Sequence, residues 1–250
     1  MPPICLHLGI AQEAITRLGH PVVDENRGSF YLGATAPDIR LLVDAGREAT
    51  HFLPLDSEGE TSGVGLMFAA YPELVEKAHL NASTRSFVAG YLSHLVTDET
   101  WIRGVYRPFF GKASPLGGDA MANILDRLLQ FELDRRERLN TETMAGICAD
   151  IDNSAASVNV RFIDGSNLSR WRDFVCVAAS RKASITDFRR FAENYPIWMR
   201  QITPEDPETF FASFDARLEQ VLTMIPQDRL QAFRGQSVDE SVKVAREYLG

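Results

Sequence analysis

The chain has few cysteines, and none of them lies in a metal-binding or redox pattern. Cys5, Cys148 and Cys176 are three in number, widely spaced and without any Cys-x-x-Cys pair. This arrangement argues against a disulfide framework and against a thiolate zinc site, and it suits a reducing compartment. If the chain binds a metal, we therefore expect the ligands to be histidines and carboxylates.

Long apolar runs are also missing. No stretch of about 18 apolar residues is available to cross a bilayer, and the start of the chain has no basic segment typical of a signal peptide. We therefore expect a cytoplasmic protein with no transmembrane segment. The net charge of −8 gives no general attraction to nucleic acid, so no stable nucleic-acid complex is expected, although a local basic patch could still contact a phosphate.

Strand-like alternation, internal repeats and low-complexity linkers are absent, whereas helical periodicity recurs along the chain. We predict one all-α domain over residues 1–250, with residues 155–165 as the weakest candidate boundary and no assigned role for residues 141–250. Ser83 and Ser237 are expected to cap helices, and Pro207 to lie in a first turn. Residues 39–60 and 103–118 are expected to be irregular. Helices are expected at residues 4–18, 29–35, 64–79 with a break at Pro72, 84–102, 119–138, 141–150, 167–180, 184–195, 207–224 and 237–249.

Two side chains on the expected helix 84–102 have the spacing of a metal-binding pair. His94 and Asp98 are four residues apart, so they lie one turn apart on the same face, where one cation could contact both. A plain hydrogen bond between them is an equally good interpretation of the pair alone. Asp38 stands in an apolar segment, His51 precedes Phe52 after an irregular segment, and His7 adjoins a helix face that should point inward. Each also has an ordinary interpretation: a turn residue, a surface loop residue and a core histidine.

The order of these residues, however, resembles that of a known family. His7, then Pro37-Asp38, then His51-Phe52, and then His94 and Asp98, resembles the zinc-dependent phospholipase C family, which is related to the S1/P1 nucleases. The resemblance covers residues 1–140 and implies an all-α fold that binds several zinc ions.

Matched position by position, the resemblance implies roles for five residues. Asp38, His51, His94 and Asp98 would bind a first zinc ion, and Asp98 would bridge to a neighbouring ion held by His7. Asp38 would also be the general base. One or two zinc ions are therefore expected.

The chain departs from the family pattern beyond this point. It has no histidine after His94, so the family's further histidine ligands are missing. Carboxylates on the expected helix 119–138 could supply a site of oxygen ligands suited to Mn²⁺, Mg²⁺ or Ca²⁺ instead. The alternative is a solvated helix face whose acids pair with arginines. These carboxylates are Asp119, Asp126, Glu132 and Asp134.

The chemistry that the resemblance implies is phosphate-ester hydrolysis. A pair of adjacent divalent metals lowers the pKa of a water molecule and stabilises charge on a phosphoryl group. Arg103 and Arg107 could contact phosphate oxygens, while Tyr106, Phe109 and Phe110 could line an apolar pocket. Alternatively, the aromatic residues pack the loop onto the helix and the arginines pair with acids.

We therefore expect a metal-dependent phosphoesterase that hydrolyses a phosphodiester or a phosphomonoester. Its substrate would be a small phosphate ester or a phospholipid headgroup. A non-catalytic metal-binding scaffold and an S1/P1-type nuclease remain as alternatives. The His-Glu-x-x-His pattern of metalloproteases and the His-Asp dipeptide of another helical phosphohydrolase class are both absent.

Overall fold

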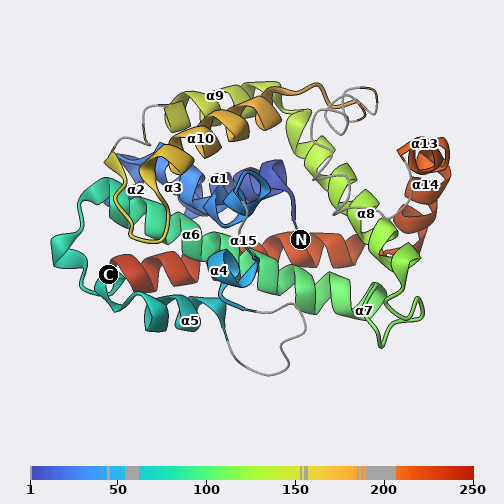
Figure 1. Cartoon of the computed structure of the whole chain (residues 1–250), viewed down its shortest axis with the longest axis horizontal. Coiled ribbons are helices and arrows are strands. Elements are labelled where there is room, and N and C mark those ends of the chain that lie inside the picture. Colours follow the sequence, from blue (N-terminus) through green and yellow to red (C-terminus); the bar gives the residue numbers. More distant parts are fainter. Residues whose placement is uncertain are drawn as a thin grey trace.

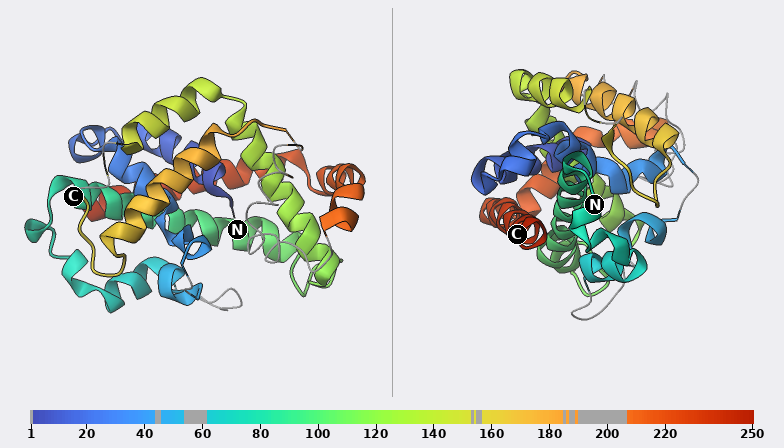
Figure 2. Two further views of the ribbon diagram at one scale, coloured as in Figure 1. Left: turned by 45° about the horizontal axis from the view of Figure 1, so that its top comes forward. Right: turned by 90° about the vertical axis from the view of Figure 1, so that its left-hand side faces the viewer.

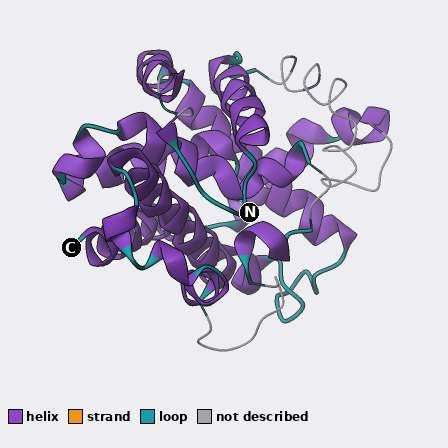
Figure 3. Cartoon of the chain, turned by 60° about the vertical axis from the view of Figure 1, so that its left-hand side comes forward, coloured by secondary structure: helices purple, strands orange, loops and turns teal. Residues whose placement is uncertain are grey.

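The computed structural model describes residues 2–43, 46–53, 62–152, 154, 157–184, 186, 189 and 207–250, and it shows helices joined by turns and loops (Figure 1). Within these ranges no β-strand occurs, as the colouring by secondary structure also shows (Figure 3). The expected all-α class is therefore confirmed for the described residues.

Four helices make the centre of the molecule: α1 (Ile4–Leu18), α3 (Arg27–Thr35), α6 (Ala82–Trp101) and α15 (Gln227–Leu249). Helix α6 packs against both α3 and α15, and α15 also packs against α1. The C-terminal helix thus belongs to the same hydrophobic core as the N-terminal one.

The remaining helices surround this centre. Helices α9 (Thr141–Asp152) and α10 (Gly165–Ser180) lie side by side, and α9 packs against α3 while α10 packs against α1 (Figures 1 and 2). Helix α8 (Ala120–Arg138) packs against α14 (Phe214–Met224) at one end of the molecule. The short elements are α2 (Pro21–Asp24), the 3-10 helix η1 (Ala36–Leu41), α4 (Glu48–His51), α5 (Gly63–Ala70), the 3-10 turns η2 (Pro72–Leu74) and η3 (Lys77–His79), the π-helical turn η4 (Ile102–Tyr106), α7 (Arg107–Phe109) and α13 (Pro207–Ala212).

Helix α1 follows the apolar pattern that predicted it. Ile4, Leu8 and Ile15 are buried on its inner face. The helix ends at Gly19, whose left-handed φ of 57° suits a residue without a Cβ atom and lets its N–H donate to the Ile15 carbonyl. The predicted helix over residues 4–18 is therefore confirmed.

Helices α3 and α6 cross with their backbones in contact. A Cβ atom on Gly33 would lie 2.0 Å from the Phe87 carbonyl oxygen, and one on Gly90 would lie 2.0 Å from the Phe30 carbonyl oxygen. Only glycine fits at either position. Because each helix places its glycine against the other's carbonyl, the two backbones are held at one separation and one register.

Two predicted helix starts are wrong. Helix α6 is capped by Asn81, whose side chain accepts from the Thr84 N–H at 2.7 Å, and not by Ser83, which bonds to Asn26 instead. Helix α15 begins ten residues earlier than predicted, at Gln227 rather than residue 237, and Ser237 is buried within it. The missed segment buries Leu230 and Phe233, and its start was missed because Ser237 resembles a helix cap in the sequence.

Several other boundaries also differ. The predicted helix 207–224 is two helices, α13 and α14, although Pro207 does begin the first of them. The predicted loop 103–118 begins instead with the π-helical turn η4 and with α7, and the irregular region 39–60 contains the end of η1 and the short α4. The predicted break at Pro72 is confirmed, and the predicted helix 184–195 falls largely outside the described residues. The predicted helices 29–35, 84–102, 119–138, 141–150 and 167–180 correspond to α3, α6, α8, α9 and α10.

None of the helices in the described ranges combines the length and apolarity needed to span a membrane. The cysteines Cys5, Cys148 and Cys176 are all free, so the described fold is held without disulfide bonds.

Candidate metal centre

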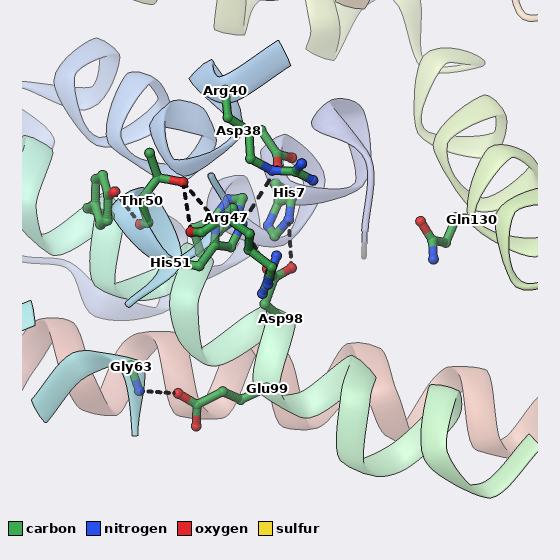
Figure 4. A network of polar contacts seen from close by, with 12 residues as sticks. His7, Asp38, Arg40, Arg47, Thr50, His51, Gly63, Asp98, Glu99 and Gln130 are labelled. Carbon is green, nitrogen blue, oxygen red and sulfur yellow. Dashed lines mark hydrogen bonds and ion pairs between the residues drawn. The ribbon is translucent and has the colours of Figure 1, made fainter. Parts of the chain in front are cut away.

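Five side chains from four separate elements meet in the interior. His7 comes from α1, Asp38 from η1 and His51 from the end of α4, while His94 and Asp98 come from α6. Their exposed fractions range only from 0% to 7%. Figure 4 shows His7, Asp38 and His51 turned toward Asp98. The structure therefore brings together the five residues for which the family resemblance implied metal-binding roles.

Local geometry aims each ligand inward. Pro37 opens the 3-10 helix that carries Asp38, because its fixed φ suits a first turn. Helix α4 ends directly after His51, where Phe52 adopts a left-handed φ of 61° and turns the chain away. The spacing of four residues places His94 and Asp98 on one face of α6, as the sequence predicted.

The separations between donor atoms fit a single metal ion. His51 Nε2 lies 3.3 Å from His94 Nε2, 3.2 Å from Asp98 Oδ2 and 3.6 Å from Asp38 Oδ1. His94 Nε2 lies 3.6 Å from Asp98 Oδ2. Zn²⁺ bound tetrahedrally to nitrogen and oxygen at about 2.0–2.2 Å has ligand atoms about 3.3 Å apart. Asp38, His51 and His94 thus form a group with the spacing of metal ligands.

Hydrogen bonds at the opposite ring nitrogens orient two of the imidazoles. His94 Nδ1 lies 2.9 Å from the Ala34 carbonyl oxygen, and His51 Nδ1 lies 2.9 Å from Thr50 Oγ1. The Thr50 carbonyl in turn accepts from the Tyr91 hydroxyl at 2.5 Å. Because a carbonyl oxygen only accepts hydrogen bonds, His94 must carry a proton on Nδ1. In the neutral ring the lone pair of Nε2 then faces the cluster, as it does in histidines that bind a metal.

Asp98 belongs to two groups of donor atoms. Its Oδ2 faces His51 and His94, whereas its Oδ1 lies 3.5 Å from His7 Nε2. The His7 ring stacks on the His94 ring with centroids 3.8 Å apart. His7, His94 and Asp98 form a second group with metal-ligand spacing. Since His94 has only Nε2 available, it can complete one site, and Asp98 is the residue able to contact two ions.

Two of these atoms are buried without a hydrogen-bond partner among the described residues. They are His7 Nε2 and Asp98 Oδ1, the two atoms that face each other. Leaving a buried polar atom unsatisfied costs about 1–3 kcal/mol. A cation between them would remove that cost, so the donor set fits a metal.

The charge state of the cluster follows from its burial and its carboxylates. Burial lowers the pKa of His51 to about 4 and also lowers the pKa of His7. Burial acts the same way on His94, but Asp98 and Asp38 outweigh it and raise the pKa of His94. Burial would raise the pKa of Asp98, yet its contacts with the three histidines hold it well below the ordinary range. The metal-free cluster therefore keeps Asp98 ionised and favours a proton on His94.

Two arginines that the sequence analysis did not propose also reach the cluster. Arg47 Nη2 lies 3.2 Å from Asp98 Oδ2, and Arg40 Nε lies 3.9 Å from Asp38 Oδ1 (Figure 4). Arg47 precedes His51 by four residues, and Arg40 follows Asp38 by two. Their proximity to predicted ligands in the chain is the signal that could have found them.

The residues expected to contact substrate lie elsewhere. Arg103 is exposed and pairs with Glu99 at 3.2 Å, and the Tyr106 hydroxyl donates to Asn123 at 3.1 Å. Arg107 is exposed, Phe109 packs against the core and Phe110 is buried in it. The arginines that lie beside the cluster are instead Arg40 and Arg47.

The four carboxylates of the predicted helix 119–138 are engaged away from the cluster. Asp119 caps α8 by accepting from the Ala122 N–H, and Asp126 accepts from Trp101 and Gln130. Glu132 pairs with Arg135 and Arg136. Asp134 accepts from Arg138 and from the Cys5 N–H. Among the described residues none of the four joins a group with metal-ligand spacing.

The chain was also compared with known proteins. No model of a protein family matches it, and neither a curated protein nor a solved structure does. The function is therefore inferred from the geometry of the metal centre.

Proposed function

We propose that the protein is a metal-dependent phosphoesterase whose centre is formed by His7, Asp38, His51, His94 and Asp98. The observation that carries the proposal is the convergence of two imidazole nitrogens and two carboxylate oxygens, with neighbouring separations of 3.2–3.6 Å, in the protein interior. Lone pairs and negative charge at such distances repel one another unless a metal ion or a proton lies among them, and the convergence of four such atoms suits a metal ion.

Zinc suits this donor set best. Imidazole nitrogen is a preferred ligand of Zn²⁺, while Mg²⁺ and Ca²⁺ favour oxygen ligands alone, and Mn²⁺ accepts a mixed set. Asp38, His51, His94 and Asp98 Oδ2 would hold one ion, and His7 with Asp98 Oδ1 would contribute to a second. When bound, the metal would supply Lewis acidity, which acidifies water and stabilises charge on a phosphoryl group.

Asp38 is the proposed general base. Burial opposes its ionisation, but His94, His51 and Arg40 together lower the pKa of its carboxyl. The carboxylate is therefore ionised at neutral pH and able to accept a proton. It is also the most exposed of the five ligands, at 7%. In the proposed reaction, the Asp38 carboxylate would accept a proton from the attacking water.

The test uses protein stripped of metal with a chelator and then reloaded. Zn²⁺ or Mn²⁺ should restore hydrolysis of p-nitrophenyl phosphate or of bis-p-nitrophenyl phosphate, and His94→Ala should abolish it. His79→Ala, at an exposed histidine outside the cluster, is the matched control. Protein that binds no metal at neutral pH would refute the proposal.

One observation favours a second candidate, a metal-binding scaffold without turnover. All five ligands are at least nine-tenths buried, as in a closed structural site. A scaffold should hold its ion tightly, lose thermal stability on chelation and hydrolyse neither ester. Asp38→Asn would then change stability alone, whereas in an enzyme it should abolish turnover while metal remains bound.

A further inference from the structure

The two arginines beside the metal ligands determine the net charge of the centre. Arg40 and Arg47 are mostly buried, with side-chain exposed fractions of 20% and 15%. Each faces a different carboxylate, Asp38 and Asp98, and both carboxylates flank His51 Nε2. The arginines therefore approach one centre from two sides.

The two carboxylates and the two guanidinium groups of the centre balance one another in formal charge. Asp38 and Asp98 contribute two negative charges, and Arg40 and Arg47 contribute two positive charges. With neutral imidazole ligands, each divalent ion then adds an uncompensated charge of +2. A buried net charge of this size is costly unless an anion accompanies it.

Several hydrogen-bond donors of the two arginines are unsatisfied. Arg40 Nε and both Nε and Nη1 of Arg47 are buried without a hydrogen-bond partner among the described residues. Guanidinium groups lack acceptor atoms, and their planar donors match the oxygens of phosphate and carboxylate groups. Unsatisfied donors beside a positively charged centre are thus complementary to an oxyanion.

From this charge balance and these donors we infer that Arg40 and Arg47 bind a dianionic phosphoryl group at the metal centre. The inference depends on the proposed metal site and narrows its substrate class. With one divalent ion held by Asp38, His51 and His94, the added charge of +2 matches a phosphomonoester or inorganic phosphate, which carries close to two negative charges at neutral pH, whereas a phosphodiester carries only one. A second ion beside His7 would favour the dianion further. The centre therefore prefers phosphomonoesters to phosphodiesters.

Binding of inorganic phosphate to the full chain, measured by calorimetry with and without bound Zn²⁺, tests the inference. The zinc-loaded protein should bind phosphate, and the metal-free protein should bind it at least about tenfold more weakly. Arg47→Met and Arg40→Met should each weaken binding by at least about tenfold, because each removes a charged donor. Zinc content, measured by elemental analysis, should stay at the wild-type value.

Two further variants separate charge from fold. Arg47→Lys keeps the charge that balances Asp98 and loses the planar donors, so it should fold and bind zinc but hold phosphate less tightly. Arg161→Met removes an exposed arginine that pairs with Glu73 at 3.5 Å, and phosphate affinity should not change. These readouts require no catalysis.

Competition with organic esters defines the ligand class. Methyl phosphate should displace inorganic phosphate at least about tenfold better than dimethyl phosphate does. Displacement by methyl phosphate alone would assign the site to soluble monoesters, and displacement also by phosphatidic acid vesicles would extend it to lipid headgroups. Either result supports a dianionic ligand.

The outcomes that overturn the inference differ from those that overturn the phosphoesterase. If zinc binds and phosphate affinity is unchanged in both arginine-to-methionine variants, or if dimethyl phosphate competes equally well, the inference is wrong and the phosphoesterase proposal stands. If phosphate binding depends on the arginines but no ester is hydrolysed, the inference holds and the enzyme proposal fails. If no zinc binds, both fail.

Discussion

His51 Nε2 and His94 Nε2 face each other at 3.3 Å, while the Nδ1 atoms of the same rings lie 2.9 Å from the Thr50 hydroxyl and the Ala34 carbonyl. The two Nε2 atoms therefore lie within contact distance of each other, with their ring orientations held by the Nδ1 contacts. We therefore expect Zn²⁺ at 100 times its dissociation constant to raise the unfolding free energy of chelator-treated protein by about 3 kcal/mol, and to raise its melting temperature accordingly. His94→Ala should abolish this gain and His79→Ala should retain it, as calorimetry can show.

His7 and Asp98 determine the number of bound ions. If His7 Nε2 and Asp98 Oδ1 hold a second ion, His7→Ala should lower the zinc stoichiometry by one and leave the ion at His51 in place. Asp98→Ala should weaken both sites, because its two oxygens face different histidines. Elemental analysis of the dialysed variants measures this. An unchanged zinc content in His7→Ala would show that His7 binds no metal.

The burial of His51 makes the metal-free protein sensitive to acid. Its pKa falls from 6.5 in the unfolded chain to about 4 in the folded protein, so the unfolded state binds more protons between these values. Unfolding free energy should therefore fall as the pH falls from 6.5 to 4, with this residue contributing about 3 kcal/mol. Urea titrations with chelator present should show a smaller loss for His51→Gln and the full loss for His79→Gln.

The crossing of α3 and α6 requires glycine at two positions. Gly33→Ala and Gly90→Ala should each destabilise the protein by about 3 kcal/mol or more, because the added methyl group meets a backbone carbonyl. Gly146→Ala is the matched control, since a Cβ atom there meets nothing within 4 Å and alanine favours a helix. Urea unfolding should show a stabilised control. A tolerated Gly90→Ala would mean that the helices are not in backbone contact.

Asp134 tests whether the acids of α8 have a structural role. Its carboxylate accepts from Arg138 and from the Cys5 N–H, each at 2.9 Å. Asp134→Ala should leave zinc content unchanged and cost about 3–5 kcal/mol, because a buried arginine loses its partner. Asp119→Ala should cost about 1 kcal/mol, through loss of a helix cap. Loss of bound metal in the Asp134 variant would instead support a ligand role.

Residue spacing predicted one pair of the centre, and the family resemblance supplied the other three candidates. His94 and Asp98 share a helix face, so their proximity follows from the sequence alone. The sequence could also identify Asp38, His51 and His7 as candidates, although the long-range contacts that unite them depend on helix packing. Arg47 and Arg40 were missed because a basic residue in an apparently irregular segment looks like a solvated one.

The fold was predicted best where apolar residues repeat at helical spacing. Helix α1 has such a stripe and a glycine stop, and both of its ends were predicted. In α15 the buried face includes Ser237 and Ser241, and Ser241 accepts a hydrogen bond from Ser93 on α6 at 2.8 Å. Pattern alone does not reveal that Ser237 is buried against another helix. The serine was therefore interpreted as a helix cap, and the first ten residues of α15 were missed.

The backbone contact between α3 and α6 makes the centre recognisable in other sequences. Gly90, His94 and Asp98 follow one another at intervals of four residues, and Gly33 precedes Asp38 by five. The two sequence patterns Gly-x₄-Asp and Gly-x₃-His-x₃-Asp together contain the glycines of the helix crossing and three proposed metal ligands, Asp38, His94 and Asp98. Chains that carry both patterns in this order are expected to share these three ligands even where the rest of their sequence has diverged. The same two patterns could be introduced into a designed pair of helices, provided that the first helix continues into a 3-10 turn that carries the aspartate.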